Sequence, residues 1–139
     1  MLYTHRIRVR YCDVDKMNIV YHGRFMDYWE WARTELFRSV GFPYSEIEQI
    51  GYILPSKQIT INYHSPLRYD EEIRIECRLI ELTKIKLVFD YNVYSETGLL
   101  AADGNTIHVF TDQNLKLMKL TSDLYQRLKR ITHEIHPDQ

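Results

Sequence analysis

Two carboxylates and an imidazole lie close together near the beginning of the sequence. Asp13 and Asp15 are separated by one residue, and His22 follows them at the start of an apolar, aromatic-rich segment. A carboxylate can take a proton from water or attack a carbonyl carbon directly. An imidazole can donate or accept a proton near neutral pH. These residue types therefore suit a hydrolytic centre at the N-terminus of a helix.

The helix start would add to this chemistry. If the helix begins near Tyr21 or His22, its first N–H groups have no acceptor within the helix, and its end carries a partial positive charge. Such groups polarise a carbonyl oxygen placed beside Asp15. Asp and Asn before a helix are nonetheless most often caps, and Asn18 alone can serve as one. By residue type and spacing alone, capping is favoured and catalysis is the alternative.

The segment from residue 22 to residue 40 is predicted to form one long helix. Apolar side chains recur in it every three or four positions, at Phe25, Trp29, Ala32, Leu36 and Val40. The helix should end at Gly41, because glycine is favoured just past a helix end and Pro43 prevents simple continuation. Residues 45–51 are expected to form a short helical turn, and residues 122–131 a short amphipathic helix.

Alternating apolar and polar residues predict five strands. They cover residues 4–11, 57–64, 71–82, 84–96 and 105–111. Turn-forming residues join the last four, so strands adjacent in the sequence are expected to pair as antiparallel hairpins or near-hairpins. His64 lies at the end of the second strand, and His108 on the fifth is interpreted as a surface or core-edge side chain.

Together these elements predict a single α+β domain over residues 1–139. A curved antiparallel sheet of about five strands should wrap the long helix, with a short C-terminal helix following the sheet. The outward face of the sheet is expected to carry apolar side chains at Ile80, Val88, Tyr94 and Phe110. Because soluble monomers seldom expose large apolar patches, we expect a homo-oligomer.

The composition narrows the possible partners. Eighteen Lys and Arg residues against nineteen Asp and Glu residues leave a formal charge of −1, and no basic stripe is present, so nucleic acid is not an expected partner. No apolar run approaches the roughly 18 residues that a membrane span needs, and no secretory signal is recognisable. We therefore expect a cytoplasmic protein without integral membrane association.

Cysteine and histidine spacing predicts neither disulfides nor a metal site. Cys12 and Cys77 lack the density of a disulfide scaffold and the spacing of metal ligands, so both are interpreted as free thiols. His133 and His136 form the only close histidine pair. They lie in a polar terminal segment, where solvated side chains explain them more simply than a metal does.

The stretch from Arg8 to Phe25 resembles the active-site signature of the 4-hydroxybenzoyl-CoA thioesterase family of hotdog-fold proteins, especially its bacterial short-chain acyl-CoA thioesterase branch. That signature is a strand followed by D-x-D-x-x-G-x-V-Y-H and an aromatic residue. The matching residues are Asp13, Asp15, Val20, Tyr21, His22 and Phe25. Residues 30–35, E-x-A-R-T-E, and residues 63–70, Y-H-x-P-L-R-Y-D, match the same branch. The resemblance spans nearly the whole chain and implies a hotdog fold.

Two positions depart from the signature. Asn18 stands where the family usually has glycine, and Val14 replaces the usual small polar residue between the acids. Asn tolerates the left-handed backbone conformation better than most residues, so the turn is expected to survive. Both departures are expected to affect substrate choice more than they affect the catalytic acid.

The resemblance implies a role for each residue before the helix. Asp15 is the catalytic carboxylate, acting as general base on water or as nucleophile on the thioester carbon, and both roles stay open. The backbone N–H at His22 polarises the thioester carbonyl, with or without help from the His22 side chain. Asp13 is expected to be a structural acid that accepts hydrogen bonds from loop amides. Tyr21 either orients the acyl group or packs.

The resemblance also implies cationic side chains for the phosphates of CoA. In the family these lie around the connection between the third and fourth strands, where Lys84 and Lys86 stand in this chain. Arg68 and Lys57 are further candidates. Without the resemblance, the lysine pair would be read as part of a solvated face.

The expected function is therefore hydrolysis of a small or medium acyl-CoA by a homodimer or homotetramer, without a cofactor. A non-catalytic module that binds acyl-CoA or an acyl-carrier thioester on the same scaffold is the alternative. A hotdog dehydratase is a third possibility, but it would place a histidine and an acid on opposing elements. The two acids before the helix fit that arrangement poorly.

Overall fold

The computed structural model describes residues 2–135. Its strands are β1 (Tyr3–Arg8), β2 (Ser56–Tyr63), β3 (Glu72–Leu82), β4 (Lys86–Tyr94) and β5 (Leu100–Val109). Its helices are α1 (Arg24–Ser39), α2 (Tyr44–Ile50) and α3 (Ser122–Ile135), and a single 3-10 turn, Tyr11–Asp13, follows β1. The side chains of His133 and His136 lie outside the described part of the chain, so the expectation for that pair is not tested.

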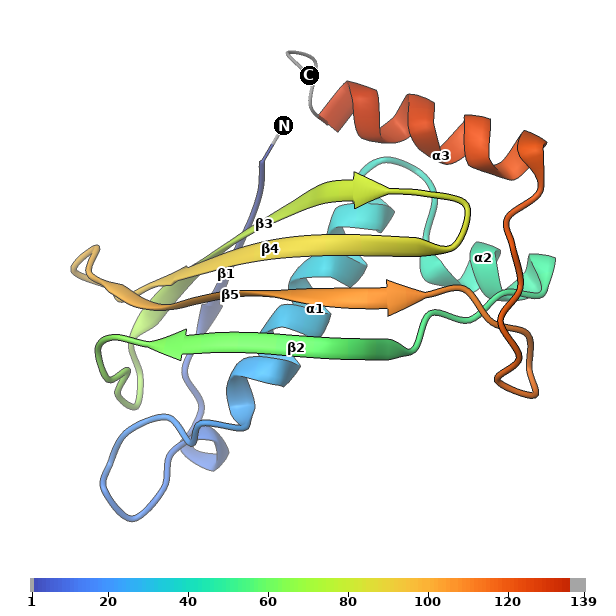
Figure 1. Cartoon of the computed structure of the whole chain (residues 1–139). Coiled ribbons are helices and arrows are strands. Elements are labelled where there is room, and N and C mark those ends of the chain that lie inside the picture. The colour runs from blue at the N-terminus through green and yellow to red at the C-terminus, as the bar shows by residue number, and fades with distance from the viewer. Residues whose placement is uncertain (1, 136–139) are drawn as a thin grey trace.

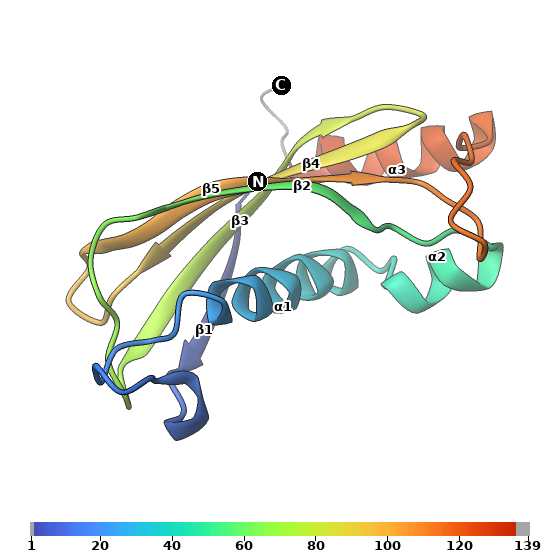
Figure 2. The same ribbon diagram turned by 60° about the horizontal axis from the view of Figure 1, so that its bottom comes forward.

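The five strands form one antiparallel sheet in the order β1-β3-β4-β5-β2. Helix α1 lies along one face of this sheet, and the strands curve over it (Figures 1 and 2). The expected α+β architecture is confirmed. One expected pairing is wrong, because β2 does not form a hairpin with β3 but pairs with β5 at the far edge of the sheet. The segment between β2 and β3 instead crosses the end of the sheet.

Strand β5 begins at Leu100, earlier than the expected start at residue 105. Small and polar residues at the beginning of β5 conceal the alternation that marks a strand. Gly104 lies within this missed part. A Cβ atom there would lie 2.0 Å from the carbonyl oxygen of Thr60 and 2.8 Å from the Trp29 ring. The glycine therefore permits the close approach of β2, β5 and α1.

Aromatic stacking fixes α1 against the sheet. The Trp29 ring lies parallel to the Tyr91 ring at 4.3 Å between centroids, and the Phe37 ring meets the edge of Phe89 at 5.9 Å. All four side chains are buried. Full burial of one such side chain contributes about 1.5 to 3 kcal/mol, so this face holds the helix, and with it the loop before it, in a fixed position.

The outer side of the sheet differs in part from the expectation. Ile80 is 51% exposed, and Val88, which alternates with the core residues Leu87 and Phe89 on β4, lies on the outward face but is buried. Phe110 is instead part of the core. Phe110 follows the end of β5, where the chain leaves the sheet and the ring packs against Tyr52 at 6.1 Å. Period-two alternation no longer applies beyond the last strand residue, and this explains the wrong assignment of Phe110 to the outward face.

The ends of α1 lie close to the predicted limits. The helix begins at Arg24, with Gly23 as its N-cap residue, so His22 precedes it. Gly41 follows the helix with φ of 78°, the left-handed conformation expected of a residue just past a helix end. Within the described residues, no helix is long and apolar enough to cross a membrane.

Candidate active site

The loop between β1 and α1 folds back on itself through backbone hydrogen bonds. The Asp15 N–H donates to the Ile19 carbonyl, and the Asn18 N–H donates to the Asp15 carbonyl, both at 3.0 Å. Asn18 has φ of 60°, so the expected left-handed turn is present with Asn in place of Gly. The Asp15 carboxylate also accepts a hydrogen bond of 2.8 Å from the Met17 N–H, which fixes the direction of its side chain.

Asp13 holds this loop to the body of the protein. Its carboxylate is fully buried and accepts hydrogen bonds from the Arg10 backbone N–H at 2.9 Å and from the Tyr28 hydroxyl at 3.0 Å. The Arg24 guanidinium lies 3.8 Å away. Burial opposes ionisation of Asp13, but the hydrogen bonds from Arg10 and Tyr28 outweigh it and hold the pKa of this carboxyl below its usual value. These are the contacts expected of a structural acid.

Asp15 faces a different environment. It is half-buried and lines a cavity of about 410 Å³, called here the Asp15 cavity. Polar groups of this cavity come from Asp15, His22, Tyr63, His64 and Ser65, and its apolar lining comes from Met17, Ile19, Val20, Phe25, Pro66 and Leu67. A mostly apolar cavity with a few polar groups is typical of a small-molecule site. The structure thus brings Asp15 and His22 together beside the start of α1.

The wall of this cavity is fixed by contacts between β2 and the helix start. The Tyr63 hydroxyl donates to the His22 carbonyl at 3.0 Å, and the Tyr63 ring meets the edge of Phe25 at 5.3 Å. The Val20 N–H donates to the Leu67 carbonyl at 2.8 Å. Two segments that are distant in the sequence, residues 15–25 and 63–67, therefore enclose one space.

The helix start presents unsatisfied donors near this space. The Arg24 N–H donates to the Tyr21 carbonyl, and the Met26 N–H donates to the Gly23 carbonyl. Among the described residues, the N–H groups of His22 and Gly23 have no acceptor. Free backbone donors at the positive end of a helix favour an oxygen that carries or develops negative charge.

Tyr21 is not part of this cavity lining. Its side chain is 49% exposed, and its ring lies 4.2 Å from the His22 ring. A Cβ atom at Gly23 would lie 2.8 Å from the Tyr21 ring. Tyr21 thus covers the start of α1, and these contacts favour the packing interpretation over a contact with the acyl group.

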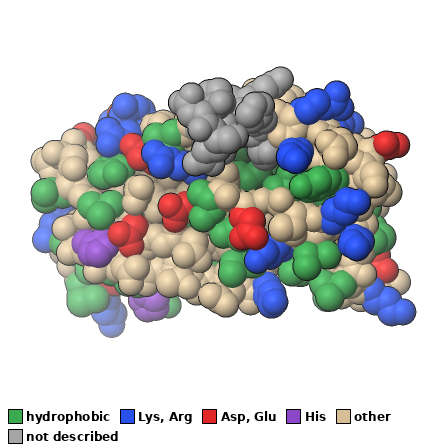
Figure 3. Space-filling model, turned by 45° about the horizontal axis from the view of Figure 1, so that its top comes forward, with side chains coloured by type: hydrophobic (Ala, Val, Ile, Leu, Met, Phe, Trp, Pro, Cys, Tyr) green, Lys and Arg blue, Asp and Glu red, His purple; other side chains and the backbone are tan. Residues whose placement is uncertain are grey.

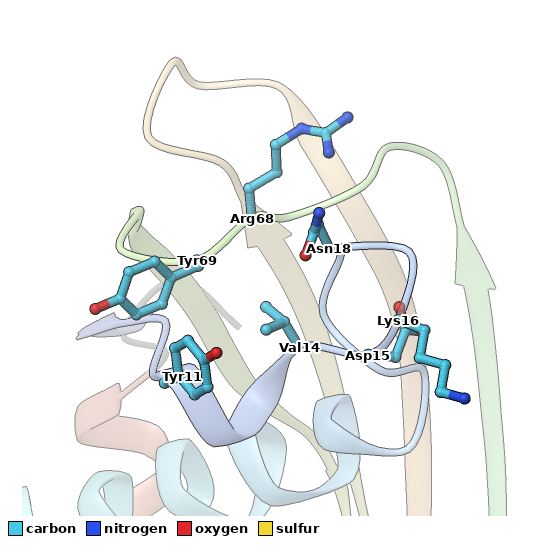
Figure 4. Close-up of a pocket in the computed structure, with 7 residues that line it drawn as sticks. All are labelled: Tyr11, Val14, Asp15, Lys16, Asn18, Arg68 and Tyr69. Atoms are coloured by element: carbon cyan, nitrogen blue, oxygen red, sulfur yellow. The ribbon is translucent and has the colours of Figure 1, made fainter.

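A second cavity, of about 620 Å³, lies against the same loop (Figure 4) and is called here the Arg68 cavity. Its lining residues are Tyr11, Val14, Asp15, Lys16, Asn18, Arg68 and Tyr69. Tyr11 and Tyr69 meet edge to face at 5.6 Å, and Figure 4 shows Arg68 extending away from them. Asp15 lines both cavities. Of the four predicted phosphate-binding residues, Arg68 is therefore the one that lies near Asp15 within a single chain.

The structure does not bring the predicted lysines to Asp15 within one chain. Lys57 and Lys86 line a third cavity, of about 320 Å³, at the opposite end of the sheet, and Lys84 donates to the Ser122 hydroxyl there at 3.2 Å. The path along β2 from Lys57 to Tyr63 spans roughly 20 Å at the rise of a strand. Figure 3 shows blue basic and red acidic side chains interspersed on the surface seen from the top of Figure 1.

His64 acquires a partner that its position in the sequence does not reveal. Its Nε2 atom lies 3.2 Å from a carboxylate oxygen of Asp103, whose other oxygen accepts a 3.0 Å hydrogen bond from the Asn62 amide. The register of β2 and β5, which pairs Asn62 with Asp103, creates this contact. Because the two residues are distant in the sequence and the pairing of β2 was assigned wrongly, no spacing motif could have found it.

His108 is not the surface or core-edge side chain that was expected, because it is only 1% exposed. One ring nitrogen lies 2.8 Å from the Thr106 hydroxyl, and the other lies 3.2 Å from the Leu54 carbonyl. Burial, reinforced by the charge of Arg33, lowers the His108 pKa to about 4. Among the described residues, no group of three His, Cys, Asp or Glu side chains is arranged to hold a metal ion.

Comparison with known proteins agrees with this fold. The profile of the thioesterase-like superfamily matches residues 9–128. The chain belongs to this superfamily. Its relatives include the YneP protein of Bacillus subtilis, which is 34% identical over 107 residues, covering 77% of this chain and 78% of YneP. The acyl-CoA thioester hydrolase YbgC of Escherichia coli O157:H7 is 26% identical over 113 residues, covering 80% of this chain and 83% of YbgC.

Solved structures share this fold. Protein TT1821 of Thermus thermophilus superposes with a TM-score of 0.86 at 32% identity, covering 94% of this chain and 98% of that chain. DHNA-CoA thioesterase of Staphylococcus aureus superposes with a TM-score of 0.89 at 24% identity, covering 98% and 91% of the two chains. The resemblance to hotdog-fold thioesterases, first drawn from the Asp13–Phe25 signature, is confirmed.

Proposed function

We propose that this protein is an acyl-CoA thioesterase, which cleaves an acyl-CoA with water into a carboxylic acid and free CoA thiol. The observation that carries the proposal is that the Asp15 carboxylate and the open start of α1 line one mostly apolar cavity. The relative named acyl-CoA thioester hydrolase YbgC supports the same reaction class. We further expect the protein to act in the cytoplasm.

In the proposed mechanism, Asp15 acts on the thioester carbon while the helix start holds the carbonyl oxygen. The His22 and Gly23 N–H groups are free to donate to the oxyanion that develops there. Asp15 acts either by taking a proton from water or by direct attack. Removing one oxyanion donor in a comparable site costs about 10²- to 10³-fold in kcat, so the backbone at His22 matters independently of its imidazole.

The cavity suits a small or medium acyl group. Met17, Ile19 and Leu67 supply apolar surface on the loop side, and Phe25 and Tyr63 close the cavity from α1 and β2. A volume of about 410 Å³ falls within the range of small-molecule sites. The acyl chain should lie against these side chains, because burying apolar area drives such binding.

A second copy of the chain would complete the binding site. Strand β2 forms one edge of the sheet (Figure 1), and its side chains are exposed or half-exposed throughout. An unpaired edge strand is a template for another strand. If two β2 strands pair antiparallel across a two-fold axis, Lys57 of the partner subunit approaches Tyr63, and the lysine end of one sheet meets the Asp15 cavity of the other. The proposed homodimer thereby reconciles the distant lysines with CoA binding.

The test is a thiol-release assay over acyl-CoA substrates of increasing chain length, with Asp15→Asn beside the wild type. We expect release from short or medium acyl-CoA and a loss in the variant, with Asp27→Asn as the matched control. Asp27 is an exposed acid in the first turn of α1, paired with Arg24 at 3.1 Å. Tight acyl-CoA binding without thiol release by the wild type would contradict the proposal and favour a binding module.

A further inference from the structure

The proposed hydrolysis leaves one group without a proton source, namely the departing sulfur. Asp15 takes a proton or forms a bond on the attacking side, but a thiolate must leave from the other side of the tetrahedral carbon. General acids at such positions are side chains whose proton can reach the leaving atom. His64 lines the same cavity as Asp15 but lies on a different element, the segment that ends β2.

The contacts of His64 are those of an oriented imidazole. Its Nε2 atom lies 3.2 Å from Asp103 Oδ2, and the Asn62 amide donates to Asp103 Oδ1 at 3.0 Å. A carboxylate bound to one ring nitrogen fixes the orientation of the ring. Among the described residues, the Nδ1 atom of His64 has no partner. It is therefore the nitrogen available to a substrate.

We propose that His64 is the general acid for the leaving thiol and that Asp103 is its positioning residue. The inference rests on the proposed thioesterase function. After water adds to the thioester carbon and Asp15 takes its proton, the C–S bond breaks and its electron pair moves to sulfur. In the imidazolium form of His64, the Nε2–H group donates to Asp103 and the Nδ1 proton transfers to that sulfur, which gives the free thiol and a neutral ring. The proton held by Asp15 then returns to His64 through solvent, so both groups regain their starting states.

A leaving thiolate that is more basic depends more on a general acid. The test therefore compares two substrates whose leaving thiols differ in acidity. His64→Gln keeps a polar side chain but cannot donate an acidic proton. We expect it to lower kcat for an acyl-CoA about 100-fold, the lower end of what a positioned acid contributes. For the S-(4-nitrophenyl) thioester of the same acyl group, whose thiolate leaves without protonation, we expect little change relative to wild type.

His5→Gln is the matched control, because His5 lies on β1 at the other edge of the sheet. It should retain wild-type turnover of both substrates. Equal retention of both by His64→Gln overturns the proposal, and so does an equal loss of both, which would indicate a packing role. Thermal unfolding of each variant separates misfolding from loss of the acid.

Asp103→Asn provides a second variant that keeps the imidazole. It should reproduce the selective loss on acyl-CoA in weaker form, because the ring remains but its orientation is relaxed, while KM stays close to wild type. An unchanged kcat for acyl-CoA in Asp103→Asn overturns its positioning role. Failure of the proposed function is distinguishable, since an inactive wild type overturns both proposals, whereas an active wild type with unaffected His64→Gln overturns only this one.

Discussion

The two sides of the loop after β1 contain the same kind of side chain in opposite environments. Asp13 faces inward, is fully buried, and has its carboxylate occupied by Arg10 and Tyr28. Asp15 faces outward, is half-buried, and lines two cavities. A carboxylate whose acceptors are already used stabilises structure, and one that borders open space can act on a ligand. The single residue between the acids is enough to separate these roles.

Substitution of the buried Asp13 should have the largest effect on stability. Asp13→Asn removes the charge that Arg10 and Arg24 neutralise and leaves the buried Tyr28 hydroxyl with a poorer acceptor. We expect the free energy of unfolding to fall by about 3 kcal/mol, as when one member of a buried pair is lost. Denaturant titration with urea measures this. An unfolding free energy within error of wild type would show that Asp13 does not anchor the loop.

His108 offers a second buried anchor, and its stability contribution should depend on pH. Its pKa is lowered from 6.5 to about 4 in the folded protein, so the unfolded chain binds the extra proton between these values. The contribution of neutral His108 to the free energy of unfolding is therefore complete above about pH 6.5 and is lost as the pH falls toward 4. Between pH 7 and pH 5 the free energy of unfolding should fall by about 2 kcal/mol.

Urea titrations at these two pH values measure the loss, and His108→Gln is the comparison. The variant should be less stable than wild type at pH 7, because Thr106 and Leu54 lose the imidazole. Its stability should nevertheless change less between pH 7 and pH 5. A wild-type stability that stays constant over this interval contradicts the assignment of His108 as a neutral core residue.

Substitutions in the turn at Asn18 should have the smallest effect on the free energy of unfolding. Asn18 has φ of 60°, and a side chain that cannot support this conformation costs about 1 kcal/mol. Asn18→Ala should lower the free energy of unfolding by that amount, whereas Asn18→Gly should retain it within error. Both variants change the loop next to Asp15, so turnover should be measured with stability. Equal stability of all three proteins would mean that the turn is not strained.

The sequence predicted local features of this molecule better than distant ones. The apolar spacing from Phe25 to Leu36 was enough to find α1, and turn chemistry located Gly41. The start of β5 was missed, because Gly104 and its small neighbours show no alternation of apolar and polar residues. Glycine is required at position 104 because the backbone of Thr60 packs closely against it. The pairing of β2 with β5 was missed, since turn residues say nothing about which strand lies at an edge.

The same division applies to the site. The signature predicted that Asp15 and His22 lie together, and both line one cavity. It did not reveal that His64 faces the same cavity with Asp103 behind it, because that pair depends on strand register. Lys57 and Lys86 lie at the far end of the sheet, and they would approach an Asp15 cavity only across the interface of the proposed dimer.

In the proposed mechanism, Asp15 does the chemistry and Asp13 supports the loop that holds it. The most direct measurement is the single-turnover rate constant for hydrolysis of the best acyl-CoA. It is taken for Asp15→Asn and Asp13→Asn at a temperature where both are folded. Asp15→Asn should lose about 10²- to 10⁴-fold while unfolding like wild type, and Asp13→Asn should keep most of its turnover per folded molecule. Near-wild-type turnover by folded Asp15→Asn would contradict the account.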